Sequence, residues 1–344
     1  MTRMREEILE QPNVVARLAA DRSPFLEAAA AARAAGAHFA LYAARGTSDN
    51  ACVFGGYLAT LCGGLPAGLA LPSAATIYHA DVDYRSCVVI GISQSGETPD
   101  VAEFVARARE AGAFTIAVTN REDSLLARVA DRVLGTGAGE ERSVPATKTY
   151  TSQLAALAMF WAAWSGDPKL IAALQTAVPA AMQAACAAEE QVQEIATRLG
   201  SKDRLLVAAR GYNYATALET ALKLRETCYV AAMPFSTPDL IHGPVAMIEP
   251  AYPALVFAVP GETYEGMCSL IGDLEKRGAE VYVVSHVPAA TPDRTVVLDA
   301  LSKVPEALSP LVAIVPGQLL SLHSSLERGL DPDKPRSLNK ITRY

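Results

Sequence analysis

Short apolar runs alternate with alanine-rich helical stretches in the first third of the chain. The expected strands cover 38–44, 86–92 and 114–118, and the expected helices cover 49–62 and 99–111. This order is typical of a parallel sheet, because parallel strands need a crossover connection that a helix normally supplies. The strand segments are apolar at nearly every position, which indicates that helices cover both faces of the sheet. We therefore expect an α/β fold with buried central strands.

The chain also contains an internal repeat. Three short matches occur in the same order, the first two 165 residues apart and the third 166 apart: Ala44-Arg45-Gly46 with Ala209-Arg210-Gly211, Gly96-Glu97-Thr98 with Gly261-Glu262-Thr263, and Gly112-Ala113 with Gly278-Ala279. Each match alone would carry no weight, but together they indicate two copies of one α/β domain. Long helices over about 149–164 and 169–199 are expected to join the copies. The polar stretch 331–340 has two prolines and no apolar periodicity, so composition predicts a frayed tail.

Charge and hydropathy exclude several protein classes. The 344 residues carry 30 Lys and Arg against 37 Asp and Glu, a net charge of −7, and 51% are hydrophobic. A disordered chain would be more polar, and a nucleic-acid binder that relies on bulk positive charge would be basic. The five histidines show no metal-ligand spacing and the six cysteines form no C-x-x-C pair. We therefore expect no metal, no disulfide framework and a reducing compartment.

The N-terminal residues and the length of the apolar runs indicate the cellular location of the protein. Glu6 and Glu7 occupy positions where a signal peptide would need its apolar core, and no uninterrupted apolar run approaches the ~20 residues of a membrane span. We expect a soluble, cytoplasmic protein that binds neither membrane nor nucleic acid.

The most informative motif is the turn after the second expected strand, Ser93-Gln94-Ser95-Gly96-Glu97-Thr98-Pro99. Thr98 suits the cap of the following helix and Pro99 its first position. Free amides at a helix N-terminus, the helix dipole and the hydroxyls of Ser93, Ser95 and Thr98 together can hold a phosphate monoester without Lys or Arg. Gly96 lets the backbone approach closely. The alternative is an ordinary strand–helix turn with a good cap.

A second turn, Gly46-Thr47-Ser48-Asp49, ends the first expected strand. It should lie beside the serine-rich turn at the carboxyl edge of the sheet, where open α/β folds bind ligands, although capping alone would also explain Thr47 or Ser48. The repeat of the serine-rich turn, 259–263, has lost the serines, so we expect an anion site in the first copy only. Residues 135–140 imitate a dinucleotide fingerprint but place Glu140 at the last glycine, so no nucleotide cofactor is expected.

Two further candidate sites rest on weaker sequence patterns. Lys223 and Glu226 lie three residues apart on one face of an expected helix at about 215–229, where spacing favours a surface ion pair over an acid–base pair in a cleft. His242 lies in a loop, and a lone histidine is more often structural than catalytic. The residue pattern decides neither case.

Ordered matches along nearly the whole chain resemble the sugar isomerase (SIS) domain family, and most closely the isomerase half of glucosamine-6-phosphate synthase. They are Glu7-Ile-Leu-Glu-Gln-Pro12, Arg45-Gly-Thr-Ser48, Ser93-Gln-Ser-Gly-Glu-Thr98, Thr147-Lys148 before Gln153-Leu154, Ala221-Leu-Lys-Leu-Arg-Glu226, His242-Gly-Pro244 and Pro335-Arg-Ser-Leu-Asn-Lys340. The resemblance implies two tandem SIS domains, each a three-layer, flavodoxin-like or Rossmann-like parallel sheet flanked by helices. On this basis we expect an N-terminal helical segment (1–24), a first, phosphosugar-binding domain (25–166), connecting helices (167–198), a second domain (199–330) and an active-site tail (331–344).

The resemblance also implies roles for individual residues. Phosphosugar binding is implied for Gly46, Thr47, Ser48, Ser93, Gln94, Ser95, Thr98, Val144 and Ala146. Glu226 would move a proton between sugar carbons 1 and 2, with Lys223 beside it. His242 would assist ring opening from a neighbouring subunit, which implies a homodimer, and Lys340 would form a Schiff base with a keto sugar. This chemistry is coherent, because an iminium at carbon 2 acidifies the adjacent C–H and lets a carboxylate move the proton.

This sequence departs from the synthase pattern at positions that affect which reaction we expect. The chain has no glutaminase half and no cysteine before Cys52, so we expect no glutamine-dependent synthesis by this chain alone. Ala146 stands where the family pattern has a serine and Ile241 where it has a lysine, which leaves the sugar preference open.

These observations lead to three hypotheses. The first is a glucosamine-6-phosphate deaminase that converts glucosamine 6-phosphate and water to fructose 6-phosphate and ammonia, without a cofactor. The second is an isomerase or deglycase that acts on another phosphorylated sugar or sugar–amine adduct. The third is a sugar-phosphate sensor. A sensor would have no need for Lys223, Glu226, His242 and Lys340 together.

Overall fold

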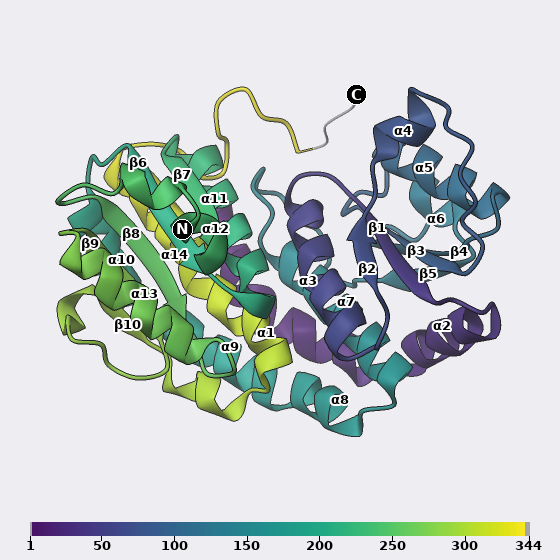
Figure 1. Ribbon diagram of the computed structural model, residues 1–344, viewed down its shortest axis with the longest axis horizontal. Helices are drawn as coiled ribbons and strands as arrows, with labels where there is room; N and C mark the ends of the chain where they lie inside the picture. Colours follow the sequence, from purple (N-terminus) through teal and green to yellow (C-terminus); the bar gives the residue numbers. More distant parts are fainter. Residues whose placement is uncertain (1, 341–344) are drawn as a thin grey trace. The chain divides into compact units, whose positions relative to one another are not determined.

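A computed structural model of the chain describes residues 2–340. The chain divides into two compact units (Figure 1). Among the described residues, the N-terminal unit contains 13–141, 148–176 and 339–340, and the C-terminal unit contains 2–12, 142–147 and 177–338.

The N-terminal unit is built on a five-stranded parallel sheet of strand order β2-β1-β3-β4-β5. The strands are β1 Phe39–Ala43, β2 Ala67–Leu69, β3 Cys87–Ile92, β4 Phe114–Thr119 and β5 Arg132–Gly135. The helices of this unit are α2 Ser23–Ala34, α3 Thr47–Leu61, α4 Pro72–Thr76, α5 Pro99–Glu110, α6 Leu125–Val129, α7 Lys148–Ser165 and α8 Pro168–Gln175. Helix α7 packs on α2 and α3, whereas α5 packs on α4 and α6, so the helices form two groups around the sheet. The α/β fold and the three predicted strands are confirmed.

The C-terminal unit repeats this architecture. Its parallel sheet has the order β7-β6-β8-β9-β10, which matches the first sheet strand for strand. The strands are β6 Arg204–Ala209, β7 Ala231–Ser236, β8 Pro253–Ala258, β9 Glu280–Ser285 and β10 Thr295–Val297. Its helices are α9 Ala177–Ala187, α10 Glu189–Leu199, α11 Tyr214–Cys228, α12 Thr237–Ile241, α13 Tyr264–Lys276 and α14 Ser309–Glu327, with short 3₁₀ turns η1 Gly211–Asn213, η2 Pro244–Met247, η3 Pro292–Arg294, η4 Asp299–Lys303 and η5 Glu306–Leu308. The duplication predicted from three short matches is therefore confirmed.

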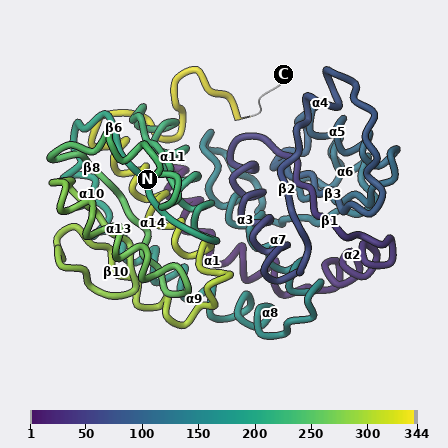
Figure 2. Tube along the Cα trace, in the orientation of Figure 1, coloured from purple at the N-terminus to yellow at the C-terminus, as the bar shows by residue number. Residues whose placement is uncertain are grey.

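Helix α14 is the central helix of the C-terminal unit, and the Cα trace shows α10 and α11 beside it (Figure 2). A Cβ atom at Gly317 of α14 would lie 2.2 Å from Oγ1 of Thr220 on α11, so a glycine is needed where these helices approach closely. The stretches 168–187 and 306–327 are long and apolar enough to cross a membrane by length and composition. The second is wholly buried inside the protein, which is the environment of a core helix.

One helix prediction was wrong. The expected continuous helix over 169–199 is three helices, α8, α9 and α10, which break at Thr176 and Ala188. Pro179 explains the first break, because proline lacks an N–H and its ring clashes with the carbonyl four residues earlier. The second break is followed by Glu189 and Glu190, whose carboxylates favour a new helix N-terminus.

The first helix, α1 (Arg3–Ala20), has its first turns, up to Pro12, in the C-terminal unit. Asp333 accepts hydrogen bonds from the amides of Arg3 and Met4 at 2.9 and 2.8 Å. Asp333 therefore caps α1 from a position 329 residues away from Met4.

Candidate functional site

The serine-rich turn joins β3 to α5 in the N-terminal unit. The hydroxyls of Ser93 and Thr98 lie 2.9 Å apart, and the amides of Gly96 and Glu97 donate to the hydroxyls of Ser93 and Ser95. Thr98 stands at the cap position of α5 as predicted, but its side chain makes no capping hydrogen bond and points to Ser93 instead. Three hydroxyls and the first turn of a helix thus gather in one turn, which suits a phosphate group.

Gly96 is required at the centre of this turn. Its φ of 65° is left-handed, and a Cβ atom there would lie 1.9 Å from Oγ of Ser124. Any other residue would force the turn away from the loop after β4.

The turn after β1 lies next to the serine-rich turn, because β1 and β3 are parallel neighbours in the sheet. An ion pair of 2.6 Å between Arg45 and Asp100 connects this turn to the first turn of α5. Ser48, in the first turn of α3, is buried and accepts a hydrogen bond of 3.0 Å from the side-chain amide of Gln153 on α7. The two predicted turns therefore meet at the carboxyl edge of the sheet, with Gly46 and Thr47 between Arg45 and Ser48.

The repeat of the serine-rich turn in the C-terminal unit has a different neighbour. The amide of Glu262 donates to Oε2 of Glu306 at 3.0 Å, and a Cβ atom at Gly261 would lie 2.1 Å from Cδ of Glu306. A carboxylate therefore already packs on this turn and would repel a phosphate group.

Helix α11 carries the candidate proton-transfer residues of the C-terminal unit. The ammonium of Lys223 lies 2.5 Å from Oε2 of Glu226 and 3.5 Å from Oε1 of Glu219. Lys223 and Glu219 are buried, whereas the side chain of Glu226 is 23% exposed. The surface ion pair favoured by spacing is wrong, because this face of α11 is buried. The arrangement places a buried cation beside a carboxylate that still reaches solvent.

Glu219 was missed at the sequence level, although a signal existed. It precedes Lys223 by four residues, so helical spacing places both on one face. A buried lysine needs such partners, because an unpaired charge in the interior is costly.

His242 follows α12 and is exposed in the chain. Its backbone amide donates to the carbonyl of Pro238 at 3.1 Å. Within residues 2–340 no hydrogen bond or ion pair joins its imidazole to Lys223 or Glu226.

The segment that carries Val144 and Ala146 is held by the ends of the C-terminal unit's own chain. The carboxylate of Glu7 accepts hydrogen bonds from the amides of Arg142 and Ser143 and from the hydroxyl of Ser143. The amide of Val144 donates to the carbonyl of Asp333 at 3.0 Å. Glu7 is buried, and the backbone that carries Val144 and Ala146 is therefore fixed within the C-terminal unit.

The C-terminal tail is not frayed over 331–340, which corrects the prediction from composition. Its prolines, Pro332 and Pro335, are buried. The guanidinium of Arg336 lies 4.0 Å from the ring centroid of Tyr229, and its backbone amide donates to the Tyr229 hydroxyl at 2.8 Å. The prediction from polar composition was wrong because no apolar face holds this tail. It is fixed by the burial of its two proline rings, by a cation–π contact and by hydrogen bonds.

Lys340, near the end of this tail, forms an ion pair of 2.6 Å with Oε2 of Glu141 in the N-terminal unit's part of the chain. Glu141 is buried and was missed at the sequence level, because nothing in a loop motif distinguishes it from its exposed neighbour Glu140.

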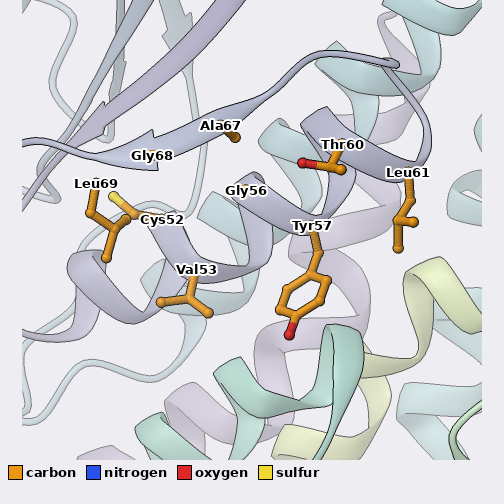
Figure 3. Close-up of a pocket in the computed structure, with 9 residues that line it drawn as sticks. All are labelled: Cys52, Val53, Gly56, Tyr57, Thr60, Leu61, Ala67, Gly68 and Leu69. Carbon is orange, nitrogen blue, oxygen red and sulfur yellow. The ribbon is translucent and has the colours of Figure 1, made fainter.

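The described residues offer two further observations on ligands. No group of three or more His, Cys, Asp or Glu side chains in residues 2–340 is arranged to hold a metal ion. An apolar groove between α3 and β2, without a charged side chain in its lining, is visible in Figure 3. It is lined by Cys52, Val53, Gly56, Tyr57, Thr60, Leu61, Ala67, Gly68 and Leu69.

Comparison with known proteins yields one family and several relatives. The SIS domain model matches residues 35–163 and 198–328. The glutamine–fructose-6-phosphate aminotransferase (isomerizing) of Methanothermobacter thermautotrophicus is 39% identical over 303 residues, which is 87% of this chain and 50% of that protein. The chain thus spans about half the length of the curated relatives it matches.

Two solved structures are similar over nearly the whole chain. A candidate phosphosugar isomerase from Silicibacter pomeroyi DSS-3 has a TM-score of 0.86 and 33% identity, and the match covers 97% of this chain and 100% of that one. The C-terminal domain of glucosamine-fructose-6-phosphate aminotransferase from Francisella tularensis has a TM-score of 0.88 and 26% identity, with 97% and 98% covered.

Proposed function

The chain belongs to the SIS domain family, and from this premise we propose that it is an isomerising glucosamine-6-phosphate deaminase, which converts glucosamine 6-phosphate and water to fructose 6-phosphate and ammonia. The observation that carries the proposal is the cluster on α11, where the buried ammonium of Lys223 lies 2.5 Å from the partly exposed carboxylate of Glu226. A carboxylate held in this way is suited to carry a proton between two carbons of a bound sugar.

Binding of the phosphate is assigned to the N-terminal unit. Ser93, Ser95 and Thr98 supply hydroxyls and α5 supplies its N-terminal dipole. Gly46, Thr47, Ser48 and Gln94 are assigned to the same sugar phosphate, and Val144 and Ala146 to the sugar itself. The carboxylate of Glu306 on the repeated turn supports placing the phosphate in the first copy.

The proposed reaction balances in four steps. His242 assists opening of the sugar ring to the aldehyde. Glu226 then takes the proton from carbon 2 and returns it to carbon 1, while the ammonium of the sugar gives one proton to the oxygen on carbon 1. Carbon 1 becomes a hydroxymethyl group and carbon 2 becomes an iminium. Attack of the Lys340 amine on carbon 2 displaces ammonia and leaves an iminium to the lysine. Water then hydrolyses this iminium and releases fructose 6-phosphate.

A homodimer in the cytoplasm is part of the proposal. His242 is exposed in the isolated chain, which fits a side chain that completes a site in a second copy. All six cysteines are free, which fits a reducing compartment.

The experiment measures ammonia and fructose 6-phosphate released from glucosamine 6-phosphate, with E226Q and K340A in parallel. We expect turnover by the parent and a loss of at least a hundredfold in kcat in both variants. E249Q, which changes an exposed glutamate paired with Arg204, serves as the matched control and should keep full activity. Absence of turnover in the parent, with phosphosugar binding intact by calorimetry, would contradict the deaminase.

A second candidate is a deglycase or isomerase for a different phosphorylated sugar. Ala146 and Ile241 favour it, because Ala146 replaces a serine of the family pattern near the expected sugar site and Ile241 replaces the lysine before His242. A panel of phosphorylated ketoses and their amine adducts separates this activity from the deaminase.

A further inference from the structure

Glu141 presents a fixed acceptor to the amine of Lys340. Its Oε1 accepts the backbone amide of Thr149 at 3.1 Å, and its Oε2 accepts the hydroxyl of Thr149 at 2.7 Å. Lys340 Nζ donates to the same Oε2 at 2.6 Å. The carboxylate is completely buried, whereas the lysine side chain is 25% exposed.

The position of this carboxylate is set by α7 and not by the lysine. Thr149 lies in the first turn of α7 and is itself buried, so the two hydrogen bonds orient both carboxylate oxygens at a helix N-terminus. The tail then brings the Lys340 amine to an oxygen that is already in place. A buried, pre-oriented oxygen at hydrogen-bond distance is what proton transfer from an amine requires.

A lysine must be neutral to attack a carbonyl or an iminium, yet lysines ordinarily keep their proton until about pH 10. We propose that Glu141 is the base that converts Lys340 to the free amine and returns the proton later in the reaction. This inference rests on the proposed function, since it assumes that Lys340 forms a Schiff base.

The proton balance of the step is complete. With fructose 6-phosphate the final hydrolysis runs in reverse: the Lys340 ammonium gives its proton to Oε2 of Glu141, and the free amine adds to the carbonyl carbon of the keto sugar. A proton of the attached amine moves to the carbonyl oxygen, which becomes a hydroxyl. The proton held by Glu141 then passes to that hydroxyl, which leaves as water and produces the iminium. The first transfer neutralises both partners of the ion pair together, so no unpaired charge is left on the buried carboxylate.

The experiment traps the Schiff base. The full-length protein is incubated with fructose 6-phosphate and sodium borohydride, and the sugar adduct on Lys340 is quantified by mass spectrometry between pH 6.5 and 10. E141Q is compared with the parent, with E141D, and with E140Q, which changes the adjacent exposed glutamate. Thermal unfolding and phosphosugar binding are measured for each variant.

We expect E141Q to be trapped at least tenfold more slowly at pH 7 and to approach the parent near pH 10, where solvent removes the proton. E140Q should match the parent, and E141D should keep part of the rate because it retains a carboxylate. A purely structural contact would not give this recovery at high pH.

Four outcomes would overturn the inference. Equal trapping of E141Q and parent at pH 7 removes the need for a base at this position and leaves the proposed function intact. A loss in E141Q that persists at pH 10 assigns Glu141 to holding the tail only. No trapping in the parent overturns both the inference and the role of Lys340 in the proposed function. If E141Q fails to fold, the trapping rates of E141D and E140Q are compared instead. An E141D rate below one hundredth of the parent rate at every pH would contradict the role of Glu141 as the base.

Discussion

The hydroxyl of Ser143 donates a hydrogen bond of 2.5 Å to the carboxylate of Glu7, although the two residues lie 136 positions apart in the chain. The amides of Arg142 and Ser143 donate to the same carboxylate. Because all of these groups are buried or half-buried, the first turns of α1 and the segment with Val144 and Ala146 are held together within the C-terminal unit. This relationship gives a structural reason for the glutamate in the Glu7–Pro12 match.

The first prediction concerns this bond. Substitution E7Q should lower the free energy of unfolding by about 1–3 kcal/mol, because buried donors lose a charged acceptor. The KM for the sugar phosphate should rise more than kcat falls, since Val144 and Ala146 are proposed to contact the bound sugar. Urea unfolding and steady-state kinetics measure the two effects. E10Q on the same helix, at an exposed position, is the control, and equal behaviour of the two variants would contradict the prediction.

The second prediction uses the internal repeat as its control. Thr98 and Thr263 occupy the cap positions of the equivalent helices α5 and α13, and neither side chain makes a capping hydrogen bond. T98A should raise the KM for the sugar phosphate about tenfold, which corresponds to one lost hydrogen bond to a charged group. T263A should leave KM unchanged, because Glu306 packs on its turn. Similar KM values in the two variants would argue against the serine-rich turn as the phosphate site.

Much of the fold followed from periodicity and repetition. The apolar runs located β1, β3 and β4 to within one residue at either end, because a strand buried on both faces has few polar positions. The sequence matches at 165 residues located the equivalent strand ends of the second sheet. These features are local or repeat at a constant offset, so sequence alone reveals them.

The residues that were mispredicted depend on contacts distant in sequence. Lys223 is buried on α11, a helix that packs against α14 about ninety residues later, and spacing carries no information on that packing. The tail is ordered through Tyr229 and Glu141, which precede it by more than one hundred residues. Helical composition likewise hid the breaks at Thr176 and Ala188. Tertiary contacts therefore decided what propensity and composition left open.

The third prediction concerns pH. The hydrogen bond from Arg5 holds the pKa of the Glu189 carboxyl below its ordinary value of 4.5, with His323 acting in the same direction and burial opposing both. A carboxyl whose pKa is lower in the folded state stabilises the fold above its unfolded pKa, and this contribution is lost as pH falls through the folded pKa. The free energy of unfolding should therefore decrease below about pH 4.5, and E189Q should reduce that decrease while costing about 1–2 kcal/mol at pH 7. Urea unfolding from pH 3 to 7 measures both, and identical pH slopes in parent and E189Q would contradict the assignment.

The fourth prediction concerns the tail contact between Tyr229 and Arg336. Y229F keeps the ring under the guanidinium but removes the hydroxyl that accepts the Arg336 amide. Lys340 follows Arg336 by four residues, so a looser tail should present the amine to its substrate less often and lower kcat three- to tenfold. The melting temperature should change little, because this contact is largely exposed.

A matched control exists in the same unit. Tyr252 lies under the guanidinium of Arg204 at 4.7 Å, in a second cation–π pair that belongs to β6 and the turn before β8. Y252F should leave kcat unchanged, because this pair has no connection to the tail. The double variant Y229F with R336A should lose less than the sum of the single losses, since both substitutions release one segment. Fully additive losses, or an equal loss in Y252F, would show that Tyr229 acts through general stability and not through the tail.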